Sequence, residues 1–134
     1  MKHKKKILII CTILLILVLV PISFVYVLNN GNPITHYIAD KKVPLHLEEN
    51  GYTTNDLKES TYIEPKHTIN RKFFHGHYKV VFEDEPTVTY YYGVTKLGNA
   101  VQQFCEKDQR SFAGVTDTVT DDLRHSEKEC ASYQ

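Results

Sequence analysis

The sequence predicts an α+β fold: an N-terminal transmembrane helix, then a helix packed on a three-stranded antiparallel meander, a short C-terminal helix and a loosely ordered tail. Three observations predict it. An uncharged run extends from Ile7 to Leu28, apolar residues then recur at helical spacing, and beyond Gly51 they alternate with polar residues. A chain of 134 residues with such a run is too short for a multidomain enzyme, a doubly wound nucleotide-binding fold or a (β/α)8 barrel.

The run from Ile7 to Leu28 is long enough to cross a bilayer. At about 1.5 Å per residue it makes a helix of about 33 Å, against a hydrocarbon core of about 30 Å. It ends in large residues from Phe24 onward, without the small residues of a cleavage site. The sequence therefore favours an uncleaved anchor, and a cleaved signal peptide ending near Pro21 is the alternative. Lipidation at Cys11 is disfavoured because no small residue precedes it.

Charge predicts the orientation of this anchor. Four lysines lie within residues 1–6, whereas the first basic residues after the run are Lys41 and Lys42. By the positive-inside rule, residues 1–6 are cytoplasmic and residues 29–134 lie outside the cell membrane. The other 12 of the 16 basic residues stand against 16 acidic ones, so the outer part has a net charge of −4. Such a domain has no evident electrostatic affinity for nucleic acid.

A helix is expected directly after the anchor. Pro33 suits a first helical position, and apolar residues recur at helical spacing from Ile34 to Ile38. Pro44 should kink the helix or make it restart, because proline removes an amide donor and clashes with the preceding turn. Gly51 suits the left-handed residue that ends it.

Beyond Gly51 the apolar residues recur at every second position, as they do in a β-strand. Residues 57–64 alternate moderately, and residues 78–82 and 88–94 alternate more clearly. The last two segments are joined by the turn Asp84-Glu85-Pro86, which favours an antiparallel hairpin.

The rest of the chain predicts one more helix. Leu97, Val101 and Phe104 have helical spacing, so a short helix is expected over about residues 97–107, and the polar chain beyond Gln109 should be loosely ordered. The expected organisation is a basic N-terminus (1–6), an anchor (7–28), an extracytoplasmic α+β domain (29–109) and a polar tail (110–134).

Several short motifs follow one another between His46 and Tyr92. Residues 46–52 read His-Leu-Glu-Glu-Asn-Gly-Tyr, residues 55–57 Asn-Asp-Leu, residues 78–86 Tyr-Lys-Val-Val-Phe-Glu-Asp-Glu-Pro, and residues 90–92 are all tyrosine. Together they resemble a family of small membrane-anchored proteins of Gram-positive bacteria with a domain of unknown function. The resemblance implies no activity, catalytic residue or cofactor. The order of helix and meander is also similar in fold to small peptidase-inhibitor-like modules outside bacterial cells.

The outer face of the hairpin is the candidate binding face. In a strand, Tyr90 and Tyr92 share one side and Tyr91 points to the other. We expect two of these rings to fill the core and the third to cover the back of the sheet; an aromatic platform for a peptide, a glycan or a membrane is the alternative. The candidate face comprises Lys79, Val81, Thr89 and Tyr91.

The cysteines and histidines offer weaker candidates. Cys105 and Cys130 are a candidate disulfide that closes a loop of about 25 residues and contributes on the order of 3 kcal/mol, with two free thiols as the alternative. Thiol chemistry at Cys105 would need a base such as His125. The pair His75 and His77, with His67 nearby in the chain, lacks the further ligands of a structural zinc site, so no metal site is expected.

The sequence thus favours a binding or interaction module whose partner is an envelope protein or a peptide. No enzymatic activity, cofactor or metal is expected. A small inhibitor or immunity protein is the alternative, and a thiol-active protein using Cys105 with Cys130 or His125 is a further one.

Overall fold

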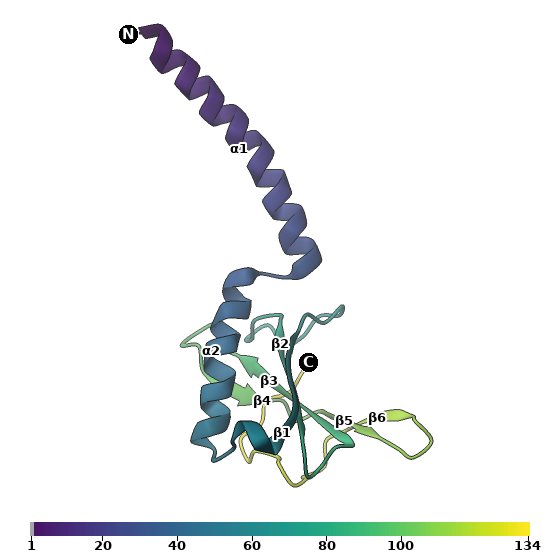
Figure 1. The fold of residues 1–134 in the computed structure, drawn as a ribbon. Coiled ribbons are helices and arrows are strands. Elements are labelled where there is room, and N and C mark those ends of the chain that lie inside the picture. The colour runs from purple at the N-terminus through teal and green to yellow at the C-terminus, as the bar shows by residue number, and fades with distance from the viewer. Residues whose placement is uncertain (1) are drawn as a thin grey trace. The chain divides into compact units, whose positions relative to one another are not determined.

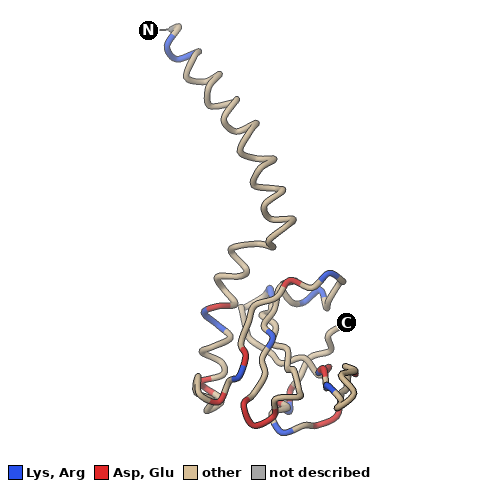
Figure 2. Tube along the Cα trace, turned by 45° about the vertical axis from the view of Figure 1, so that its right-hand side comes forward, with Lys and Arg blue, Asp and Glu red and all other residues tan. Residues whose placement is uncertain are grey.

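The structure is a computed structural model that describes residues 2–134 and divides into two compact units, the second comprising Ile34–Gln134 (Figure 1). The first unit contains helix α1 (Lys2–Asn30), whose apolar side chains are exposed along its length. Beyond Lys6, α1 carries no charged residue (Figure 2). It is long and apolar enough to cross a membrane, a property that suits an anchor and a signal sequence alike.

Helix α2 (Pro33–Glu49) begins at the predicted proline. Its end is also as predicted: Gly51 has a φ of 88°, and the amide of Tyr52 donates to the carbonyl of Leu47 at 3.0 Å. The expected restart at Pro44 is wrong, because α2 continues through this residue. Pro44 lies on the exposed side of the helix, so its ring does not disturb the buried contacts.

The predicted meander is confirmed. Strands β1 (Leu57–Ile63), β2 (His77–Phe82) and β3 (Val88–Val94) pair antiparallel in sequence order, and a short 3-10 helix, η1 (Thr54–Asp56), precedes them. Lys79 of β2 lies directly opposite Tyr91 of β3. The fold class is α+β, as the sequence predicts.

The predicted C-terminal helix is wrong, because the chain forms strands there. These are β4 (Val101–Gln103), β5 (Lys107–Arg110) and β6 (Thr116–Val119), which extend the meander to a six-stranded sheet of order β1-β2-β3-β5-β6, with β4 also paired to β3. Gly98 and Asn99 have φ values of 82° and 52° and make a turn that no right-handed helix accommodates.

The polar tail is not loose but packs against the sheet as a C-terminal segment (residues 120–134). The buried amide of Gln103 holds it: Nε2 donates to the carbonyl of His125 and to the hydroxyl of Tyr92, both at 2.8 Å. The Gln103 side-chain oxygen accepts from the backbone amide of Glu127 at 2.9 Å. The buried side chain of Gln103 therefore ties β4 to the end of the chain.

The main core lies between α2 and one face of the sheet. Val43 and Leu47 of α2 pack in one cluster with Phe82, Tyr90 and Tyr92, which are almost fully buried. Because Tyr90 and Tyr92 face this core and Tyr91 lies on the back, the expected division of the three tyrosines is confirmed.

A smaller cluster lies on the back of the sheet, where Phe73 and Phe104 contact each other with ring centroids 4.9 Å apart. Gly93 permits this contact, since a Cβ at residue 93 would lie 2.6 Å from Phe104 and 2.7 Å from Phe73.

Replacing Leu47 should test the packing of α2. Leu47 is 2% exposed, so Leu47→Ala is expected to lower the free energy of unfolding by about 2–5 kcal/mol. Leu45, two residues away and 48% exposed, is the matched control, and Leu45→Ala should cost less than about 1 kcal/mol. Urea unfolding of the full chain in detergent micelles measures both values; equal losses would contradict this placement of α2.

Candidate functional site

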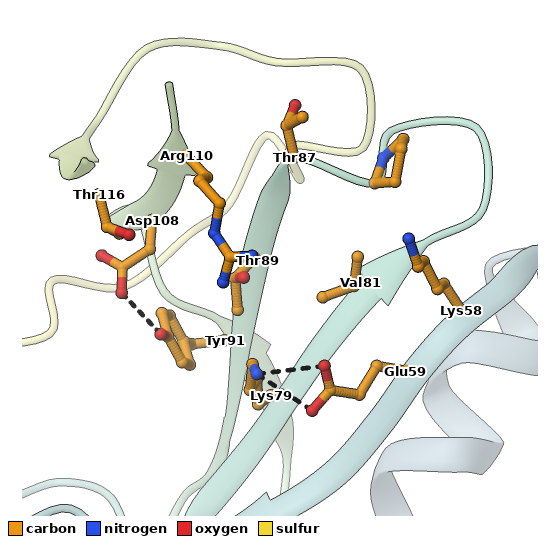
Figure 3. Close-up of a pocket in the computed structure, with 11 residues that line it drawn as sticks. Lys58, Glu59, Lys79, Val81, Thr87, Thr89, Tyr91, Asp108, Arg110 and Thr116 are labelled. Atoms are coloured by element: carbon orange, nitrogen blue, oxygen red, sulfur yellow. Dashed lines mark hydrogen bonds and ion pairs between the residues drawn. The ribbon is translucent and has the colours of Figure 1, made fainter. Parts of the chain in front are cut away.

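The four residues of the candidate binding face come together on the side of the sheet that faces away from α2. Alternation places Lys79 and Val81 of β2 beside Thr89 and Tyr91 of β3. All four line one pocket of about 290 Å³ (Figure 3). Val81 is buried at its base, while the other three side chains are partly exposed.

Two contacts hold the floor of this pocket in place. The ammonium of Lys79 donates to both carboxylate oxygens of Glu59, at 3.0 and 3.1 Å. The hydroxyl of Tyr91 donates to Asp108 at 2.8 Å, and Thr118 donates to the other oxygen of that carboxylate at 3.0 Å. Burial, together with Asp108, raises the pKa of Tyr91, so this phenol stays protonated near neutral pH. The floor is therefore a fixed arrangement of strands β1, β2, β3, β5 and β6.

Two cationic side chains on the rim have no partner among the described residues. Within residues 3–134, whose side chains the structure describes, neither Arg110 nor Lys58 forms a side-chain hydrogen bond or an ion pair. Three threonine side chains also line the pocket. The full lining comprises Lys58, Glu59, Lys79, Val81, Pro86, Thr87, Thr89, Tyr91, Asp108, Arg110 and Thr116.

A second pocket of about 620 Å³ continues the same face. It shares Tyr91 and Asp108 with the first, so the two meet at the hydrogen bond between these residues. Its walls include the apolar groups of Ile63, Pro65 and Tyr133. Burial, with nearby Asp108, raises the pKa of Tyr133 to about 12, which leaves its hydroxyl neutral near pH 7. The back of the sheet thus carries a polar pocket and an adjoining, more apolar one.

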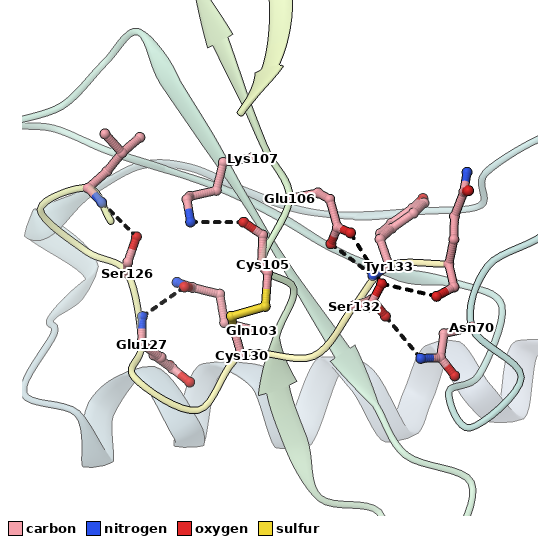
Figure 4. Close-up of a disulfide and its surroundings, with 12 residues drawn as sticks. Asn70, Gln103, Cys105, Glu106, Lys107, Ser126, Glu127, Cys130, Ser132 and Tyr133 are labelled. Atoms are coloured by element: carbon pink, nitrogen blue, oxygen red, sulfur yellow. Dashed lines mark hydrogen bonds between the residues drawn. A yellow bond between two sulfur atoms is a disulfide. The ribbon is translucent and has the colours of Figure 1, made fainter. Parts of the chain in front are cut away.

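The C-terminal segment forms one wall of the second pocket, and a disulfide between Cys105 and Cys130 fixes it (Figure 4). The bridge closes a loop of 25 residues, which in the chain-entropy model is worth about 3 kcal/mol. Beyond it, the backbone amide of Tyr133 donates to Glu106 at 2.8 Å, and its ring packs on Phe104 with centroids 4.9 Å apart. The disulfide therefore positions Tyr133 beside Tyr91.

The structure does not support the version of the thiol alternative in which His125 is the base for Cys105. Both sulfurs are in the disulfide, so Cys105 has no thiol to ionise. The ring of His125 is bonded elsewhere: Nδ1 lies 3.0 Å from the Tyr52 hydroxyl and Nε2 lies 2.8 Å from Asp84, with the ring stacked on Phe82 at 3.8 Å. His125 thus connects the C-terminal segment to the turn between β2 and β3.

The other histidines have separate surroundings. His75 lies 3.1 Å from Glu64 and contacts the carbonyl of His67, whereas His77 is fully buried among the rings of Tyr91, Phe104 and Tyr133. Among the described residues, no group of three or more His, Cys, Asp or Glu side chains is arranged to hold a metal ion. Burial lowers the pKa of His77 to about 4, so its ring is neutral near pH 7.

The residues of this site that sequence reasoning missed include Asp108, Arg110 and Tyr133. Asp108 falls just after the helix expected over residues 97–107 and Arg110 falls in the expected tail, although their positions in β5 place both beside β3. The available signals were the turn residues Gly98-Asn99, which predict a hairpin, and Cys130, which a disulfide would bring back to the sheet.

A family model described as a protein of unknown function, DUF3139, matches residues 2–92 of this chain. The chain belongs to the DUF3139 family. The match spans α1, α2 and β1, β2 and most of β3, whereas Arg110 and the disulfide of this DUF3139 protein lie beyond the matched residues. No curated protein and no solved structure matches the chain.

The buried His77 predicts a pH dependence of stability. The pKa of His77 falls from 6.5 to about 4 on folding. Protonating His77 therefore disfavours the folded state, so its contribution to stability is fully present above pH 6.5 and is lost as the pH falls toward 4. The free energy of unfolding should decrease by about 3 kcal/mol over this range. His46, whose pKa is raised by its hydrogen bond to Glu127, acts in the opposite direction, as its contribution is lost when pH rises. The difference between wild type and a His77 variant isolates the first effect.

The variant is His77→Phe, which keeps a ring among the surrounding aromatic side chains. Urea unfolding of the full chain at pH 7 and pH 4.5 should show a smaller loss of stability in this variant than in the wild type. An equal loss in both proteins would contradict the assignment.

Proposed function

We propose that this DUF3139 protein is a single-pass, membrane-anchored binding module. In this proposal α1 is the anchor, residues 29–134 lie outside the cell membrane, and the back of the sheet binds an envelope protein or a peptide. Four lysines before the apolar run favour that orientation. A disulfide between Cys105 and Cys130 is compatible with an oxidising location outside the cytoplasm.

The observation that carries the proposal is the part of the back of the sheet that the C-terminal segment leaves uncovered. Helix α2 buries one face of the sheet, whereas the other face presents two adjoining pockets around Tyr91 and Asp108. Tyrosine, arginine and hydroxyl side chains in a preformed concavity are typical of recognition surfaces. A small inhibitor or immunity protein would use such a face in the same way.

Cysteine labelling in intact cells tests location and binding together. In a Cys11→Ala background, Ser111→Cys places a thiol on the exposed turn between β5 and β6, and Thr89→Cys places one in the first pocket. A membrane-impermeant maleimide should label Ser111→Cys in intact cells. Thr89→Cys should react at least severalfold more slowly in cells than in purified protein, because a bound partner covers the pocket.

Two results would contradict the proposal. Labelling of Ser111→Cys only after permeabilisation would place the domain on the cytoplasmic side. A Thr89→Cys thiol that reacts equally fast in cells and in purified protein, relative to Ser111→Cys in the same samples, would show an unoccupied face.

A further inference from the structure

The first pocket has an unbalanced charge. Its lining carries three cationic side chains, Lys58, Lys79 and Arg110, against two carboxylates, Glu59 and Asp108. Lys79 pairs with Glu59 at 3.0 Å, and Asp108 accepts hydrogen bonds from neutral hydroxyl groups. The lining therefore has one positive charge in excess, and Arg110 and Lys58 are the cations without a carboxylate partner among the described residues.

Arg110 is placed to use this charge. Its backbone amide donates to the carbonyl of Thr87 at 2.8 Å, which fixes the end of β5 against β3. The side chain points from β5 into the pocket (Figure 3). Three hydroxyl groups also line the pocket, those of Thr87, Thr89 and Thr116, and no hydrogen bond from them is made within the described part of the chain. Guanidinium and hydroxyl groups are donors, so the pocket offers donors to an anion.

We propose that the back of the sheet binds an acidic peptide segment, with a carboxylate of the segment on Arg110 and an apolar side chain from the same side of the segment in the second pocket. A guanidinium pairs with a carboxylate through two parallel hydrogen bonds, and Lys58 adds a second positive charge on the rim. The second pocket begins at Tyr91, where its apolar groups are those of Ile63, Pro65 and Tyr133. The two pockets thus recognise two side chains, two residues apart, on the same side of one extended segment.

The charge of the surroundings favours a single carboxylate over a polyanion such as a phosphate polymer. One excess positive charge matches one carboxylate. Glu106 and Asp108 line the second pocket, and they would repel further negative charges placed along the face. A chain of phosphates also has no apolar group that could pack against the apolar walls of that pocket.

The inference rests on the proposed function, and peptide selection tests it separately. Phage-displayed random heptapeptides are selected on the full-length protein in detergent micelles, and the affinity of the enriched peptides is measured by fluorescence anisotropy. We expect the peptides to contain Asp or Glu two residues from an aromatic or aliphatic residue. Arg110→Gln should weaken their binding about tenfold, because a hydrogen-bonded charge pair is lost. Lys128→Gln removes an exposed cation that does not line either pocket, and it should leave affinity unchanged.

A double-mutant cycle identifies the pair. Changing the acidic residue of the peptide to its amide should weaken binding to the wild type about tenfold but have little effect on binding to Arg110→Gln. Additive effects would overturn the pairing. Peptides without an acidic residue that still require Tyr91 would overturn this inference and leave the binding face intact. No enrichment at all, or Arg110-dependent binding of inorganic phosphate alone, would overturn the acidic-peptide proposal. The labelling of Thr89→Cys then tests independently whether a partner covers this face in cells.

Discussion

The packing of α2 against one face of the sheet is the constraint on which the rest of the structure depends. A helix covers only one face, so burial of Phe82, Tyr90 and Tyr92 beneath Val43 and Leu47 leaves the alternate residues of the same strands on the other side. Lys79, Thr89 and Tyr91 are on that side as a direct consequence. The alternation that builds the core therefore also builds the candidate site.

The second constraint is the C-terminal segment, which a helix-and-meander fold does not require. Gln103, the disulfide of Cys105 and Cys130, and Glu106 attach it to the strands at successive points. Nearly all of these attachments are polar or covalent, as expected of a segment with few apolar residues. Its last residues place Tyr133 on the back of the sheet, so this segment covers one end of the face and leaves the other open.

The sequence predicted the elements whose patterns are local. Helix α2 from Pro33, its end at Gly51 and the hairpin of β2 and β3 follow from spacing and turn residues close in the chain. The pairings of β4 and β5 with β3 depend on contacts distant in sequence, and Leu97, Val101 and Phe104 imitate a helix by their spacing. Lys79, Val81, Thr89 and Tyr91 could be assigned to one face by alternation alone, whereas Arg110 becomes their neighbour only through the pairing of β5.

Nuclear Overhauser effects between methyl groups of α2 and the tyrosine rings of β3 test the central claim most directly. With Val43 and Leu47 labelled in the full chain, cross-peaks are expected to the rings of Tyr90 and Tyr92 and none to Tyr91. Cross-peaks from these methyl groups to Tyr91 or Thr89 would contradict the account, because they would place α2 over the face that is proposed to bind.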